Sequence, residues 1–152
     1  MIGVVVWSCS TDKSATAPKP KEVYVVNLDG ASERPTPRVT AATGVAVVEV
    51  LDDNTITYAV TATGLVGAIA GHFHVGDPTV AGAIMYGIYN NAAGTDFGGS
   101  QVAAGTITRT GGGFSGAFTF DSLLTNIRAG TAYVNLHTKT YPGGEIRGQI
   151  VK

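Results

Sequence analysis

The sequence predicts a single all-β domain. The chain has 152 residues, of which 44% are hydrophobic and 8% aromatic, enough to fill one core. Its 21 glycines follow no collagen period and lie where strands would turn. In residues 55–61, Ile56, Tyr58 and Val60 share one face and three threonines share the other, which is typical of a strand buried on one face.

Short β-rich runs follow one another from residue 23 onward. The first covers residues 23–28, and the two prolines in residues 32–37 then break regular structure because each lacks an N–H donor. Polar or glycine-rich residues at 77–82 and 91–100 are expected to form loops. The further strands expected are 44–51 and 55–63, a hairpin around Asp52-Asp53-Asn54, and then 69–75, 83–90, 102–109 and 114–120.

One short helix is expected at residues 122–128. Asp121 or Ser122 can cap its start, and Gly130 is placed to end it. The apolar side chains at helical spacing are Leu123, Leu124 and Ile127. After this helix, residues 131–137 and 145–151 are expected to form a terminal hairpin.

All three histidines lie in two predicted strands. Side chains two apart share a face, so His72 and His74 point away from Phe73, and His137 points away from Leu136. Three neutral imidazoles on neighbouring strands would form an open site that suits zinc or copper. Their nitrogens should then converge within about 3 to 4 Å, as tetrahedral coordination at ~2 Å per bond requires. Alternatively, the histidines are solvated or hydrogen-bonded to the backbone.

The terminal hairpin adds a carboxylate to this region. If Glu145 pairs with His137, then Asn135 faces Arg147 and Tyr133 faces Gln149. Glu145 could then orient the His137 ring behind a bound metal ion. Equally, Glu145 and Arg147 could form an ordinary polar ladder on the sheet surface.

Charge and cysteine content exclude several classes of function. Charged residues make up 14% of the chain and the net charge is −1, so no nucleic acid partner and no direct binding to an anionic membrane are expected. Cys9 is the only cysteine, so an intramolecular disulfide is impossible. No Ser-His-Asp or Cys-His arrangement is present, and no catalytic residues are assigned.

The N-terminus resembles the end of a bacterial lipoprotein signal peptide cut before Cys9. Residues 2–7 are apolar, and a polar, proline-containing stretch follows Cys9. We therefore expect a signal remnant at 1–9 with lipidation at Cys9, a flexible tether at 10–22 and a folded domain at 23–152. The alternative is an apolar N-terminus with an incidental thiol. The lipoprotein resemblance implies a bacterial cell envelope protein, lipid-anchored or secreted, that meets the membrane only through its anchor.

Four motifs in order resemble those of the CHRD domain, first described in chordin. They are Leu-Asp-Gly-Ala-Ser-Glu-Arg-Pro at 28–35, Ala-Thr-Gly at 42–44, Gly-His-Phe-His at 71–74, and Tyr-Val-Asn-Leu-His-Thr with Pro-Gly-Gly-Glu-Ile-Arg-Gly-Gln within 133–149. The resemblance implies an antiparallel, Greek-key-like β-sandwich of immunoglobulin-like or superoxide-dismutase-like form. The histidine strand also resembles the copper strand of copper,zinc superoxide dismutases. Three histidines cannot build that dinuclear site, although they could bind a single copper ion.

Three functions follow from these observations. The first is a non-enzymatic envelope module that binds a ligand, with copper or zinc at His72, His74 and His137 as the first candidate. The alternative is an extracellular protein-interaction module without a metal. The third is an enzyme built on the metal centre with Glu145 as general base, which we do not favour because a metal site alone supplies neither the acid nor the substrate pocket.

Overall fold

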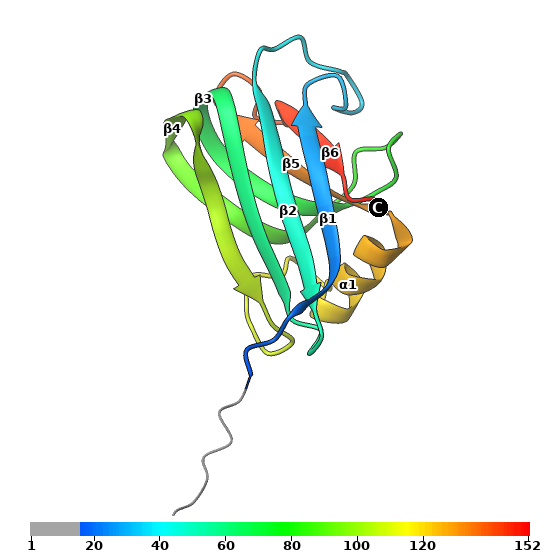
Figure 1. Cartoon of the computed structure of the whole chain (residues 1–152). Helices are drawn as coiled ribbons and strands as arrows, with labels where there is room; N and C mark the ends of the chain where they lie inside the picture. Colours follow the sequence, from blue (N-terminus) through cyan, green and yellow to red (C-terminus); the bar gives the residue numbers. More distant parts are fainter. Residues whose placement is uncertain (1–15) are drawn as a thin grey trace, which may run out of the picture.

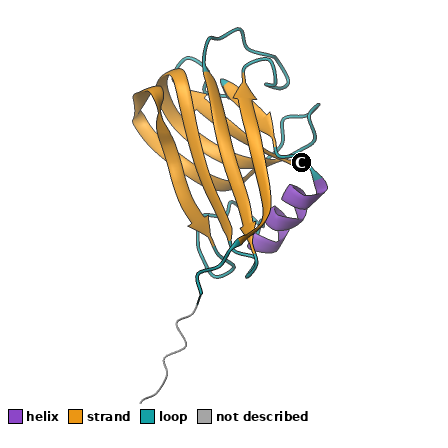
Figure 2. Ribbon diagram, in the orientation of Figure 1, coloured by secondary structure: helices purple, strands orange, loops and turns teal. Residues whose placement is uncertain are grey.

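The structure, a computed structural model, describes residues 16–152 as six strands and one helix (Figures 1 and 2). The predicted signal remnant and the lipidation site Cys9 lie outside the described residues. The elements are β1 (Pro20–Asp29), β2 (Thr43–Leu51), β3 (Ile56–Val75), β4 (Ile84–Ile107), α1 (Phe120–Ala129), β5 (Ala132–Thr138) and β6 (Ile146–Gln149). The prediction of an all-β fold with one short helix is confirmed.

The strands form one antiparallel sheet that closes on itself. Its order is β2-β1-β6-β5-β3-β4, and β2 also pairs with the first part of β3. The last part of β3 pairs with β5, so this single strand belongs to both sides of the closed, barrel-like sheet (Figure 1). The Greek-key-like sandwich stays a prediction, because these hydrogen bonds join all the strands into one sheet.

Strand β3 changes direction where the sequence suggested a break. The predicted strands 55–63 and 69–75 are one strand, with Gly64 and Gly67 at φ values of 68° and 66° between them. Glycine adopts such positive φ values without the steric cost of a Cβ atom. Several register shifts with β4 lie in the same stretch. The bend lets one chain segment serve both sides of the sheet.

The loop predicted at residues 91–100 is wrong, because these residues continue β4. Leu65 pairs with Phe97, and Ala68 pairs with Thr95. Phe97 is buried in the core. The polar, glycine-rich composition suggested a loop, but pairing with the distant β3 satisfies the backbone and keeps the segment extended.

The region before the helix also differs from its prediction. Residues 114–120 do not form a strand, and only Phe114 makes an isolated bridge with Tyr86. The helix begins at Phe120, and its N-cap is Thr119 rather than Asp121 or Ser122. The Thr119 hydroxyl accepts from the Ser122 N–H, while the Ser122 hydroxyl accepts from the Thr119 N–H. Gly130 ends the helix as predicted, at φ 70°.

The folded domain begins three residues earlier than predicted. Strand β1 begins at Pro20, so the last three residues of the predicted tether belong to the sheet. Pro20 pairs with Leu51, and the Lys19 carbonyl accepts from the Asp52 N–H. The hairpin of β2 and β3 around residues 52–54 and the terminal hairpin of β5 and β6 are confirmed.

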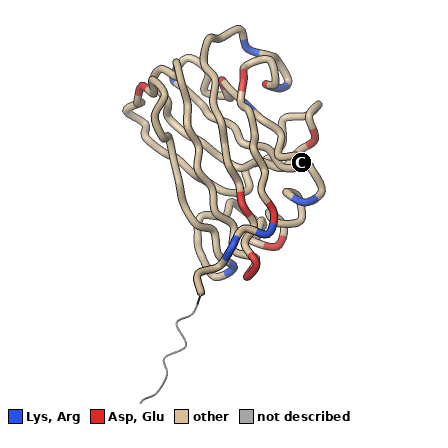
Figure 3. Tube along the Cα trace, viewed as in Figure 1, with Lys and Arg blue, Asp and Glu red and all other residues tan. Residues whose placement is uncertain are grey.

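The closed sheet surrounds a core of aliphatic and aromatic side chains, and α1 adds Phe120, Leu123, Leu124 and Ile127 to it. Charged residues are few and lie mostly in loops and near strand ends (Figure 3). Within residues 16–152, no helix combines the length and apolar character needed to cross a membrane. The polar faces of β3, β5 and β6 lie side by side, and the three histidines lie there.

Candidate metal centre

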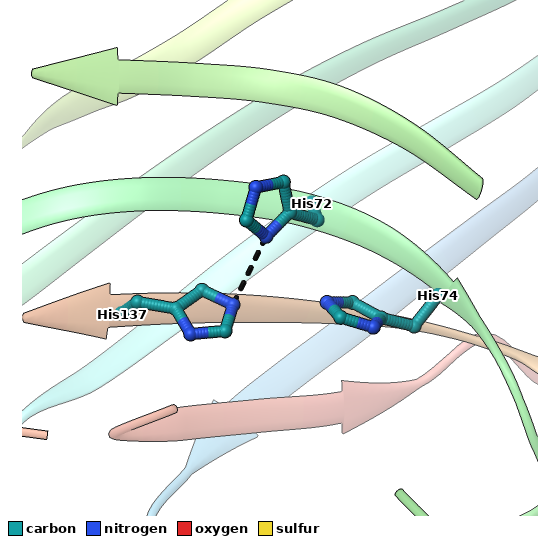
Figure 4. A group of neighbouring side chains, drawn as sticks. All are labelled: His72, His74 and His137. Atoms are coloured by element: carbon teal, nitrogen blue, oxygen red, sulfur yellow. Dashed lines mark hydrogen bonds between the residues drawn. The ribbon is translucent and has the colours of Figure 1, made fainter. Parts of the chain in front are cut away.

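Strands β3 and β5 bring the three histidines together. His74 pairs with Tyr133, His72 with Asn135, and Ala70 with His137. The predicted parity is confirmed, since Phe73 lies in the core while its two histidine neighbours lie on the opposite face. His72 Nδ1 and His137 Nε2 are 3.0 Å apart, and one nitrogen from each ring lies within 4.8 Å of the others (Figure 4).

The polar face that carries the histidines is largely covered. His72 is half-buried, whereas the exposed fractions of His74 and His137 are only 7% and 8%. Loop carbonyls close over the face, because Gly82 contacts His74 and Pro142 contacts His137. The histidine face is therefore a partly desolvated environment.

The two loop carbonyls determine which ring nitrogens are free. His74 Nδ1 lies 3.0 Å from the Gly82 oxygen, and His137 Nδ1 lies 3.0 Å from the Pro142 oxygen. A carbonyl oxygen only accepts, so both Nδ1 atoms must carry the proton and both Nε2 atoms present a lone pair. The His72 Nδ1–H then donates to His137 Nε2. Backbone carbonyls fix metal-binding histidines in the same way.

All three imidazoles are neutral at neutral pH. Burial, together with the neighbouring His137 and His74, lowers the pKa of His72 to about 4. Burial also lowers the pKa of His74 to about 4, against the Gly82 hydrogen bond, and lowers that of His137. Neutral rings are the form that coordinates a metal ion.

The spacing partly meets the requirement for a metal ion. Nitrogens bound tetrahedrally at roughly 2.0–2.1 Å lie about 3.3 Å from one another. The pair of His72 and His137 is close to this, while the full set extends to 4.8 Å. A bound ion would need to shorten the longest nitrogen–nitrogen separation by about 1.5 Å. His72 would also move its proton from Nδ1 to Nε2. Three protein nitrogens leave one coordination position open.

Glu145 does not contact the histidine that it was predicted to orient. Its two carboxylate oxygens accept from the hydroxyls of Thr40 and Thr138, each at 2.6 Å, and the Pro142 carbonyl holds His137 instead. The alternative of a surface ladder with Arg147 also differs from the structure, since both side chains are buried. The predicted pairs of Asn135 with Arg147 and Tyr133 with Gln149 are confirmed.

Arg147 ties a loop to the centre. Its guanidinium donates to the carbonyls of Asp77 and Val80 and lies 3.5 Å above the Tyr133 ring. Tyr133 stacks on His74 at 4.9 Å with an interplanar angle of 9°. The sequence placed Tyr133 and Arg147 on the polar face of the hairpin, but it did not show that they support His74.

Glu33 is the residue that the sequence left without a role. It lies in the loop between β1 and β2, is 2% exposed, and accepts from Asn135 Nδ2. Burial raises the pKa of Glu33 to about 7, although nearby Arg147 and the Asn135 hydrogen bond lower it. The sequence feature that could have pointed to Glu33 is its place in the CHRD-like motif at residues 28–35.

The comparisons with known proteins identify the family of the domain. A family model described as the CHRD domain matches residues 24–150. No curated protein and no solved structure matches the chain. The match includes all three histidines, Glu33 and Arg147.

Proposed function

We propose that the chain, which belongs to the CHRD domain family, is a non-enzymatic module that binds one copper or zinc ion. Family membership supports the non-enzymatic part of the proposal, because the CHRD domain is not a family of enzymes. The ligands would be His72 Nδ1, His74 Nε2 and His137 Nε2. The observation that carries the proposal is the convergence of all three histidines of the chain on one partly buried spot.

The chemistry of these groups supports a transition metal. Imidazole suits zinc and copper, and carboxylate or carbonyl oxygens would instead suit magnesium or calcium. His74 Nε2 is buried and lacks a hydrogen-bond partner among residues 16–152. An unpartnered buried acceptor is costly, and a metal ion would satisfy it.

Isothermal titration with Zn(II) and Cu(II) tests the proposal. The titrated protein is the full chain with Cys9→Ser, because the only thiol could bind either ion itself. We expect one ion per chain, with binding lost in His74→Ala and in His137→Ala. Glu145→Gln is the matched control, because Glu145 bonds two threonine hydroxyls and not the histidines. Equal binding by the parent and both alanine variants would exclude the site.

We also propose that the domain is held in a bacterial cell envelope by a lipid on Cys9, or is secreted. The resemblance of residues 1–9 to a lipoprotein signal peptide supports this proposal. Mass spectrometry of the mature protein tests it. An N-terminal Cys9 carrying acyl chains is the expected result, and an unmodified Met1 would contradict it.

A second candidate function is recognition of an extracellular protein. Val23 and Val25 on β1 and Val45 on β2 are 48%, 63% and 37% exposed, and this apolar patch is separate from the histidines. A photo-crosslinker at position 25 tests the idea, with one at the exposed Thr106 as the control. A discrete adduct from position 25 alone would support it, and the same pattern from both positions would not.

A further inference from the structure

Two buried atoms near the centre have no hydrogen-bond partner. Among the residues that the structure describes, His74 Nε2 and Asn135 Oδ1 are the buried side-chain nitrogen and oxygen atoms in this state. The buried lone pair of His74 is explained if it coordinates a metal ion. The Asn135 oxygen needs a hydrogen-bond donor that residues 16–152 do not supply.

Glu33 fixes the orientation of the Asn135 amide. The Nδ2 group of Asn135 donates to a Glu33 carboxylate oxygen. Above its pKa of about 7 the Glu33 carboxylate is ionised and only accepts, so the amide cannot then turn over without losing this bond. Oδ1 therefore stays available as an acceptor.

The strand register places Asn135 at the histidine cluster. Asn135 is the direct partner of His72 across the β3–β5 pair, and it lies between Tyr133 and His137 on the same face of β5. A hollow of about 400 Å³, lined by residues of β3 and β4 that include His72, Gly87 and Tyr89, opens the His72 side of the cluster to solvent.

We propose that Asn135 holds the exogenous ligand at the fourth coordination position. Its Oδ1 accepts a hydrogen bond from a water molecule, or from another small ligand with an O–H or N–H group, that is bound to the ion between the three histidines. Asn135 is a positioning residue in this arrangement, and it favours ligands that donate over anions that cannot. This inference rests on the proposed metal site.

Azide titration of the Co(II)-loaded chain tests the inference, with the visible absorption of cobalt as the readout and Cys9→Ser as the background. Azide displaces the metal-bound water but cannot donate to Oδ1. In Asn135→Leu the water loses its acceptor, so azide should bind about fivefold more tightly, as expected for one hydrogen bond. Glu145→Gln is the matched control, because Glu145 bonds the hydroxyls of Thr40 and Thr138 and neither the histidines nor Asn135, so an azide affinity within about twofold of the parent is expected.

Each outcome has a distinct meaning. Cobalt binding with the same azide affinity in the parent and Asn135→Leu would overturn this inference and leave the metal site standing. Absence of cobalt binding by the parent chain would overturn both. If Asn135→Leu does not fold, a crystal structure of the Zn(II)-loaded parent decides the matter. The inference requires a metal-bound oxygen about 2.7–3.2 Å from Asn135 Oδ1, and it fails if that contact is missing.

Discussion

Replacing Glu33 by glutamine should change the pH dependence of stability in a defined direction. Burial beside Asn135 raises the pKa of this carboxyl from 4.5 to about 7 in the folded chain. The folded protein therefore holds a proton between these values that the unfolded chain releases. The resulting stability is fully present below pH 4.5 and is lost as the pH rises through about 7.

The structure gives the size of the effect. The difference in pKa corresponds to about 3.5 kcal/mol, at about 1.4 kcal/mol per pKa unit. Glu33 lies in the loop between β1 and β2, and relaxation of this loop around the charged carboxylate recovers part of the energy, so we expect about 2 kcal/mol. Glutamine has nearly the shape of the neutral acid and does not titrate. Glu33→Gln should thus gain about 2 kcal/mol relative to the parent between pH 5 and pH 8.

Urea unfolding at a series of pH values measures this difference. The three histidines titrate in both proteins, so their contribution cancels when the two free energies of unfolding are subtracted. Asp53→Asn is a suitable control, because Asp53 lies in the exposed turn between β2 and β3, far from Glu33 in the fold, and accepts from the Thr55 N–H. A parent-minus-variant difference that is constant from pH 5 to pH 8 would refute the reasoning.

Three further variants test the packing around the centre. In Gly82→Ala a Cβ would lie 1.5 Å from the Val75 carbonyl oxygen, so we expect the free energy of unfolding in urea to fall by at least about 3 kcal/mol and zinc binding to weaken. The control is Gly98→Ala, whose Cβ would meet nothing within 4 Å, so its stability should stay within about 0.5 kcal/mol of the parent. Tyr133→Phe removes the hydroxyl that accepts from the Gly82 N–H and should cost about 1 kcal/mol in the same assay; an unchanged stability would show that this bond is unimportant. Gly130→Ala places a side chain at φ 70° and should cost about 1 kcal/mol, and a gain in stability by thermal unfolding would contradict the assigned helix cap.

Local patterns predicted much of the fold. Alternation along residues 55–61, the facing of His72 and His74, and the pairing of Asn135 with Arg147 all depend on neighbours in a strand or a hairpin. Long-range pairing could not be read in the same way. Residues 91–100 form a strand only because β3 lies beside them, and their own composition favours a loop.

The candidate site could likewise be predicted only in part from the sequence. Its three histidines could be predicted, because their identity and their parity are properties of two short segments. The groups that surround them come from loops, and one of these loops is distant in sequence. Glu33 reaches Asn135 across 102 positions of sequence, and the carbonyls of Gly82 and Pro142 carry no side-chain signal at all. No local pattern shows such contacts.

The bent strand β3 also has a consequence for how the chain folds. Its first part pairs with β2 through a short hairpin, whereas its last part must await β5, whose His137 lies 65 positions beyond His72. Contacts between distant segments form slowly, because loop closure costs entropy before the pairing stabilises it. The histidine cluster therefore exists only in chains that have completed this late step. During refolding, a change in the environment of the histidines would mark the moment when the sheet closes, separately from the formation of the early hairpin.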